Sequence, residues 1–170
     1  MNEHIRYIFL DRDGVLNEDD GYVHSFAHLR WIPGSREAVG LLSKQGKLLF
    51  VVTNQSGVAR GFYTEQDVRT LHQAMNSEFQ VYGGQIKEFF YCPHLPGAPI
   101  KRYDVLCNCR KPKPGMIQRA MAMYGICPEE AVLIGDSRRD MEAAKAAGIQ
   151  GLLFPGGNLM DFILAQGLAD

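Results

Sequence analysis

The chain has 170 residues, of which 46% are hydrophobic and 22% charged, a composition typical of a globular protein and not of a disordered or fibrous one. With 18 basic and 19 acidic residues its formal net charge is −1, so no overall positive field favours nucleic acid or an anionic membrane. The longest apolar run, Leu48 to Val52, is far shorter than the roughly 20 residues of a membrane helix, and the first residues lack a secretory-signal pattern. We expect one soluble, cytoplasmic domain over residues 1–170.

Short apolar runs alternate along the chain with amphipathic stretches. In chain order, the pattern predicts a strand over 5–10, a helix over 34–45, a strand over 48–52, a helix over 64–82 with a capping box at its start, a strand over 86–91, an irregular stretch over 92–113, a helix over 114–124, a strand over 131–134, a helix over 139–147, a strand over 151–154 and a closing helix over 158–166. Such alternation is typical of parallel strands joined by crossover helices. The predicted fold class is therefore α/β, with a doubly wound, mainly parallel sheet.

Ligands of such sheets bind beyond the carboxyl ends of the strands. The first strand is followed there by Asp11 and Asp13, whose carboxylates repel each other at such close spacing and so favour a divalent cation between them. Taken alone, the pair is better explained as a solvated acidic turn, with Gly14 supplying the backbone angles. Further polar residues weaken that simpler interpretation, because they follow later strands in a set order.

The order is an acid pair, a hydroxyl, a lysine and a further acid. It resembles the four motifs of the haloacid dehalogenase superfamily of phosphotransferases, and the resemblance covers residues 5 to about 155. The motifs are Asp-x-Asp, Thr or Ser, Lys, and Gly-Asp-x-x-x-Asp, and the residues that match them are Asp11, Asp13, Thr53, Lys111, Asp136 and Asp140. The resemblance implies a Rossmann-like core, here without room for a large cap domain.

The resemblance also implies a role for each residue. Asp11 is the expected nucleophile, forming an aspartyl-phosphate, and Asp13 the general acid and base. Thr53 and Lys111 are expected to hold the phosphoryl oxygens. Catalytic Mg²⁺ is expected on the side chains of Asp11 and Asp136 and on the backbone carbonyl of Asp13. Asp140 is expected either to orient Lys111 or a metal-bound water, or only to cap the helix that follows it.

Three of the four cysteines lie within one irregular stretch together with a histidine. Cys92, His94, Cys107 and Cys109 are a complete ligand set for tetrahedral zinc, and a set with no vacancy favours a structural site. The alternative is a metal-free group of reduced thiols. Because residues 95–106 are rich in proline and lack a core pattern, we expect structural Zn²⁺ to fold this loop, about residues 92–109. The remaining histidines His4, His28 and His72 are expected at the surface.

Longer motifs narrow the resemblance to heptose 1,7-bisphosphate 7-phosphatases, with histidinol-phosphate phosphatases as close relatives. The motifs run from Asp11 to Asn17, Gly21 to His24, Thr53 to Gly57, Cys92 to His94 and Cys107 to Pro112. By resemblance, the residues that contact the substrate are Asp19, Asp20, Gly21, Tyr22, Thr53, Asn54, Gln55, Ser56, Arg110 and Lys111.

The second phosphate of a bisphosphate needs a further cation. Arg110 is the expected one, because its fork of donors suits phosphate, and Lys101 and Arg102 are outer candidates. A simpler interpretation makes Tyr22 a core aromatic residue and His24 an ordinary loop histidine.

The expected function is therefore Mg²⁺-dependent hydrolysis of the 7-phosphate of a heptose bisphosphate in nucleotide-heptose precursor synthesis, with a small phosphorylated sugar as the only partner of a monomer. Histidinol-phosphate hydrolysis remains an alternative, since the acidic run 18–20 offers a site for an amine. A non-catalytic zinc-loop binding module is a third possibility, but it requires the loss of an essential group, and none is missing.

Overall fold

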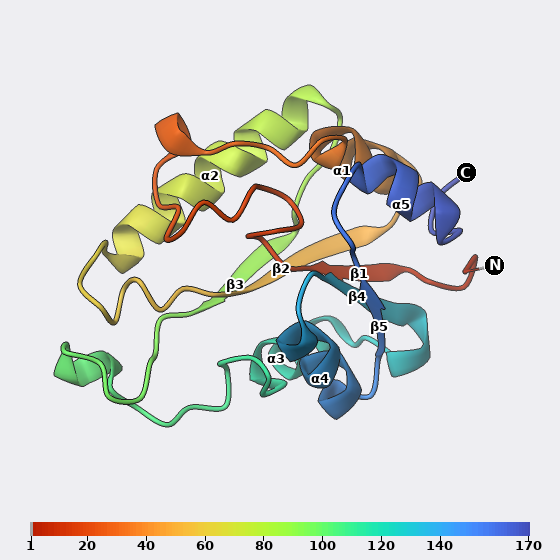
Figure 1. Ribbon diagram of the computed structural model, residues 1–170. Coiled ribbons are helices and arrows are strands. Elements are labelled where there is room, and N and C mark those ends of the chain that lie inside the picture. The colour runs from red at the N-terminus through yellow and green to blue at the C-terminus, as the bar shows by residue number, and fades with distance from the viewer. Residues whose placement is uncertain (1) are drawn as a thin grey trace.

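The computed structural model describes residues 2–170 and contains one sheet of five parallel strands in the order β3-β2-β1-β4-β5. The strands are β1 (Tyr7–Leu10), β2 (Leu48–Asn54), β3 (Glu88–Cys92), β4 (Ala131–Gly135) and β5 (Gln150–Leu153). The helices are α1 (Ser35–Lys44), α2 (Glu65–Val81), α3 (Gly115–Tyr124), α4 (Arg138–Ala147) and α5 (Leu159–Ala165). Figure 1 shows α1, α2 and α5 on one face of the sheet and α3 and α4 on the other, which confirms the doubly wound prediction.

The central strands are buried on both faces because their side chains alternate between two cores. In β1, Ile8 and Leu10 pack into the core beneath α1, α2 and α5, while Phe9 packs into the core beneath α3 and α4. A strand that is apolar on both faces reads as a continuous apolar run, which is why periodicity found it. Among residues 2–170, no helix is long and apolar enough to cross a membrane.

The segments that follow the strands contain no large inserted structure. Residues 11–34 and 93–114 hold only two three-residue 3₁₀ turns, Phe26–His28 and Lys101–Tyr103, and a third turn spans Pro128–Glu130. Turns this short have no periodicity, so sequence patterns did not indicate them. No cap covers the carboxyl edge of the sheet in the part of the chain that the structure describes, and the loops there are free to shape a site.

Strand β2 is longer than predicted, and the difference matters for the site. The apolar run ends at Val52, but the ladder continues, with Thr53 opposite Tyr91 and Asn54 opposite Cys92 of β3. The two polar residues therefore belong to a hydrogen-bonded strand and not to a loop. Their side chains are fixed by the sheet.

One expectation about exposure is wrong. His72 is not a surface residue: it is buried on α2 beneath the first loop, stacked on Phe89. Residues 95–106, whose sequence shows no core pattern, nevertheless contribute Ala98 and Tyr103 to a satellite cluster with Val58. Isolated apolar residues in a proline-rich stretch show no period, so their burial depends on contacts with distant segments.

Candidate active site

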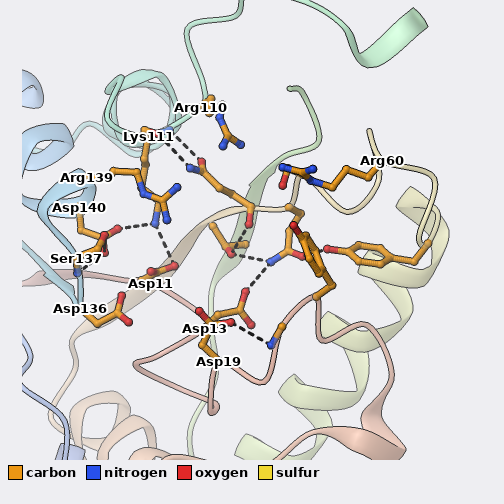
Figure 2. Close-up of a pocket in the computed structure, with 17 residues that line it drawn as sticks. Asp11, Asp13, Asp19, Arg60, Arg110, Lys111, Asp136, Ser137, Arg139 and Asp140 are labelled. Atoms are coloured by element: carbon orange, nitrogen blue, oxygen red, sulfur yellow. Dashed lines mark hydrogen bonds and ion pairs between the residues drawn. The ribbon is translucent and has the colours of Figure 1, made fainter. Parts of the chain in front are cut away.

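A cavity of about 480 Å³ lies at the carboxyl ends of β1, β2 and β4. Figure 2 shows that side chains from these strand ends and from the loops around them point into it. Of the residues predicted from sequence for catalysis, Mg²⁺ or substrate, it brings together Asp11, Asp13, Asp19, Gly21, Tyr22, Thr53, Asn54, Gln55, Ser56, Arg110, Lys111 and Asp136. Asp20 is not in this lining: its carboxylate faces outward and accepts a hydrogen bond from Arg30 Nε at 2.9 Å.

Lys111 is the buried cation of the site. Its Nζ lies 3.0 Å from Asp11 Oδ1 and 2.6 Å from Asp140 Oδ1, and it donates to the Val52 carbonyl at 2.8 Å. Burial alone lowers the pKa of Lys111, but the two carboxylates outweigh it and raise this pKa above 10.5. The lysine is therefore charged and held beside Asp11, where it can face a phosphoryl oxygen.

Asp140 fills both roles that the sequence left open. Its Oδ1 orients Lys111, and its Oδ2 accepts from the amide of Ser137 at 3.2 Å and from Ser137 Oγ at 3.0 Å, closing the capping box of α4. Burial opposes ionisation of Asp140, but Lys111 lowers its pKa below the ordinary value. Asp140 lines the cavity, but both of its oxygens are engaged, so its role is to position the lysine.

Glycine at position 14 makes room for Asp136. Gly14 has a φ of +88°, and a Cβ on it would lie 1.9 Å from Asp136 Oδ2. Any side chain at position 14 thus displaces the carboxylate at the end of β4, and glycine also tolerates the left-handed backbone. The turn after β1 and the acid after β4 fit together only with this residue.

Asp13 is held by three donor residues from the loops that follow β1 and β2. Its Oδ1 accepts from Arg12 Nη2 at 3.0 Å and from Asn17 Nδ2 at 3.0 Å, whereas its Oδ2 accepts from Gln55 Nε2 at 3.1 Å. The same Gln55 amide donates to Thr53 Oγ1 at 2.9 Å. Tyr63, which sequence reasoning missed, donates to Gln55 Oε1 at 2.6 Å and so fixes which way that amide points.

Asn54, predicted as a substrate contact, clamps the backbone of Lys111. Its Oδ1 accepts from the Lys111 amide at 2.9 Å, and its Nδ2 donates to the Lys111 carbonyl at 3.1 Å. The end of β2 thus fixes the lysine against the sheet, although the lysine lies on a loop that follows the cysteines.

Three arginines reach the cavity: Arg110, Arg60 and Arg139, of which sequence reasoning indicated only the first. In Figure 2, Arg60 and Arg110 lie on the side away from Asp11 and Asp136. Arg110 Nη1 is buried yet has no hydrogen-bond partner, which is unusual for a charged donor. Arg60 belongs to the loop after β2 and Arg139 follows Asp136 by three residues, so both lay beside recognised motifs.

Tyr22 stands at the rim of the cavity and is 45% exposed, so it is not a core residue. Its φ is +53°, and its ring packs edge-on against Phe62 and beneath Arg60. His24 is exposed and stacks on Tyr63. Lys101 and Arg102, the outer candidates for a phosphate contact, do not line the cavity.

The carboxylates fit a divalent cation. Oxygens of Asp11, Asp136 and Asp140 lie within 4.8 Å of one another. Burial raises the pKa of Asp11 well above its ordinary value, and burial and the charge of Asp140 raise that of Asp136. Both oxygens of Asp140 are bound to Lys111 and Ser137. Asp11 and Asp136 are therefore the pair whose side chains would hold Mg²⁺, and such a hard cation would reduce the repulsion between their carboxylates.

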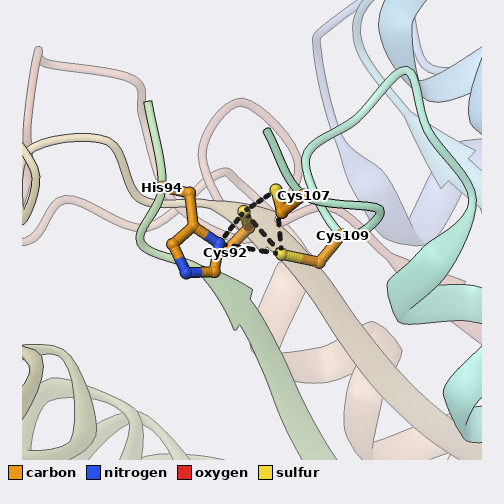
Figure 3. A group of neighbouring side chains, drawn as sticks. All are labelled: Cys92, His94, Cys107 and Cys109. Carbon is orange, nitrogen blue, oxygen red and sulfur yellow. Dashed lines mark hydrogen bonds between the residues drawn. The ribbon is translucent and has the colours of Figure 1, made fainter. Parts of the chain in front are cut away.

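The structure brings the four predicted zinc ligands together, and their chemistry suits zinc (Figure 3). Two of the three sulfur–sulfur distances are 3.4 and 3.5 Å, Cys109–Cys92 is 2.8 Å, and His94 Nδ1 lies 3.4 Å from Cys109 and 3.6 Å from Cys92. A tetrahedral ion with bonds of about 2.3 Å to sulfur spaces its ligands by roughly 3.8 Å. Hydrogen bonding from Cys92 lowers the pKa of Cys109 to about 6, which favours the thiolate that metals bind.

A family model described as "HAD-hyrolase-like" matches residues 108–164. The chain is 44% identical over 155 residues, 91% of its length and 86% of the relative's, to a D-glycero-beta-D-manno-heptose-1,7-bisphosphate 7-phosphatase of Rhodopseudomonas palustris. It is 40% identical to the protein of the same name from Escherichia coli K12, over 88% of this chain and 78% of that one.

The fold agrees with a solved structure as well. The crystal structure of D,D-heptose 1,7-bisphosphate phosphatase from B. bronchiseptica, complexed with magnesium and phosphate, superposes with a TM-score of 0.81 at 35% identity. The match covers 98% of this chain and 89% of that one.

Proposed function

We propose that this chain, which belongs to the D-glycero-beta-D-manno-heptose-1,7-bisphosphate 7-phosphatase family of HAD-like hydrolases, hydrolyses the 7-phosphate of that β-anomeric sugar bisphosphate. The product serves nucleotide-heptose synthesis for lipopolysaccharide. The observation that carries the proposal is the cavity itself: it holds a carboxylate pair with a lysine at one end and three arginines around it. That arrangement suits a substrate with two anionic groups.

The first step is phosphoryl transfer to Asp11. A carboxylate oxygen of Asp11 bonds to phosphorus while the bond from phosphorus to the sugar oxygen breaks. Lys111 Nζ, 3.0 Å from Asp11 Oδ1, and Thr53 Oγ1 stabilise the charge that develops on the phosphoryl oxygens. Mg²⁺ held by Asp11 and Asp136 would neutralise the phosphate and favour the ionised form of Asp11.

Asp13 handles the proton in both steps. It donates a proton to the departing sugar oxygen, and then accepts one from the water that attacks the aspartyl-phosphate and releases inorganic phosphate. Oδ1 of Asp13 is saturated by Arg12 and Asn17, whereas Oδ2 has the single donor Gln55. Oδ2 is therefore the oxygen with capacity for the transferred proton.

Arg110 is proposed to bind the second phosphate, at C1. Its buried Nη1 has no hydrogen-bond partner among residues 2–170, and an anion in the cavity would supply one. Arg60 lies on the same side of the cavity as Arg110, whereas Arg139 lies near Lys111 and Asp140 (Figure 2). A structural Zn²⁺ on Cys92, His94, Cys107 and Cys109 would hold Arg110 in place, because Arg110 directly follows the last of these ligands.

Histidinol phosphate fits less well. Of the acidic run that might receive its amine, only Asp19 lines the cavity, and Asp20 pairs with Arg30. We further propose that the enzyme acts in the cytoplasm as a monomer.

Phosphate release with Mg²⁺ tests the assignment, comparing the β and α anomers of the heptose bisphosphate with histidinol phosphate. We expect kcat/KM to be highest for the β anomer. A preference for histidinol phosphate overturns the substrate, and equal rates on all three overturn the role of Arg110 in specificity.

A further inference from the structure

Arg12 is the largest fully buried side chain in the part of the chain that the structure describes, and its guanidinium stays charged at any working pH. It stands between the nucleophile and the acid, yet points away from the cavity. Nη2 donates to Asp13 Oδ1 at 3.0 Å and to the Val23 carbonyl at 2.7 Å, and Nε lies 3.2 Å from Asp13 Oδ1. A buried guanidinium is stable only when its donors are paired.

The remaining nitrogen, Nη1, faces His72 Nε2 at 3.2 Å. Because arginine has only donors, the imidazole must accept, so Nε2 carries no proton and the ring is neutral. Burial, and then the charge of Arg12, hold the pKa of His72 well below 6.5, in agreement with a neutral ring. The ring is stacked on Phe89 at 4.4 Å, which fixes its plane.

We propose that His72 is a positioning residue for proton transfer, acting through Arg12 on Asp13. Nη1 is bound to His72 and Nη2 to the Val23 carbonyl, so the guanidinium cannot rotate. Nε and Nη2 are thereby held in position to donate to Asp13 Oδ1. That contact turns Oδ2 toward Gln55 and the cavity. The inference rests on the proposed function, because it requires Asp13 to be the general acid of that reaction.

The test compares leaving groups. A sugar oxygen needs a proton as it departs, but p-nitrophenolate does not, so misplacing Asp13 slows only the first reaction. kcat/KM reports the steps up to departure of the leaving group. For His72→Leu we expect kcat/KM on the heptose bisphosphate to fall about tenfold or more, and kcat/KM on p-nitrophenyl phosphate to stay within roughly twofold of the wild type.

Two further variants make the result specific. His72→Gln keeps an acceptor for Arg12 and is expected to restore most of the heptose activity. Leu71→Ala, buried on the same helix, is the matched control, and a loss of stability there is expected to affect both substrates equally. If circular dichroism shows that His72→Leu does not fold, Arg12→Lys replaces it in the comparison. This variant keeps the positive charge but loses the planar set of guanidinium donors.

Equal loss on both substrates, or no loss in a folded variant, overturns the inference. Failure of the proposed function is distinguishable, because the wild type would then release phosphate from p-nitrophenyl phosphate but not from the heptose bisphosphate.

Discussion

The carboxylate cluster and the cysteine cluster are built in opposite ways. Asp11 follows β1, whereas Asp136 and Asp140 come more than a hundred residues later, and they meet because β1 and β4 are neighbours in the sheet. Of the four residues that would bind zinc, Cys92 ends β3, and the other three follow within residues 94–109 on one irregular loop. The first cluster is preformed by strand pairing, while the second needs a metal to hold its loop. The carboxylates that follow β1 and β4 therefore have their relative positions fixed by the sheet.

The two clusters meet at Arg110 and Lys111. The chain leaves Cys109 and passes directly to these cations, but only Lys111 is also tied to the sheet, through Asn54, Val52 and Asp11. Perturbing the carboxylates is therefore expected to stop the reaction, and perturbing the zinc loop to alter the binding of the remote phosphate.

The largest effect is expected for Asp11→Asn. The amide cannot attack phosphorus, so kcat falls by more than about 10³-fold on every phosphate ester. Asp140 still pairs with Lys111, so the thermal midpoint is expected to change little. Phosphate release and a thermal melt check the two parts. Retained activity contradicts the aspartyl-phosphate mechanism.

Cys109→Ser tests the other cluster. We expect the bound zinc, measured by mass spectrometry of the metal, to be lost. kcat/KM on the heptose bisphosphate is expected to fall on the order of 10- to 100-fold, because Arg110 is misplaced. p-Nitrophenyl phosphate, which has no second phosphate, serves as the control and is expected to react nearly as before. An equal loss on both substrates contradicts the separation of the two regions. Cys127→Ser, at an exposed thiol outside the cluster, is the matched control variant.

Arg110→Gln isolates the residue that links the clusters. Losing a charged hydrogen bond of about 1.5–3 kcal/mol is expected to raise KM for the bisphosphate roughly tenfold or more, with kcat nearly unchanged. Arg110→Lys keeps the positive charge but loses the planar pair of guanidinium donors, so its KM is expected to lie between those of the wild type and Arg110→Gln. A drop in kcat with an unchanged KM places Arg110 at the reacting phosphate instead.

The smallest effect concerns stability at acid pH. His72 has a lowered pKa in the folded protein and an ordinary pKa near 6.5 when unfolded, so below about pH 6.5 the unfolded chain takes up a proton that the folded one does not. The free energy of unfolding therefore decreases as pH falls, by at most ~1.4 kcal/mol per pH unit from this group. Urea titrations of wild type and His72→Gln at pH 7.5 and 5.5 measure the difference, and identical pH dependence contradicts the neutral buried ring.

Sequence patterns predicted the α/β class and every strand and helix, because these depend on local order in the chain. They also indicated part of the cavity lining, including Asp11, Thr53 and Asp136, but missed Arg60 and Arg139. They did not predict that Thr53 and Asn54 extend β2, since polar residues interrupt an apolar run. Sequence patterns also did not predict that His72 is buried or that Arg12 pairs with it. The two residues are 60 positions apart, and a local sequence pattern gives no information on contacts at that distance.

The fit between Gly14 and Asp136 has a consequence for how this protein can vary. Every amino acid other than glycine adds an atom where the carboxylate oxygen already lies. A single replacement at position 14 thus displaces the carboxylate proposed to bind Mg²⁺, and a second change at position 136 cannot restore that carboxylate. In a saturation library selected for activity, these two positions are expected to be invariant together, although 121 residues separate them and they share no hydrogen bond.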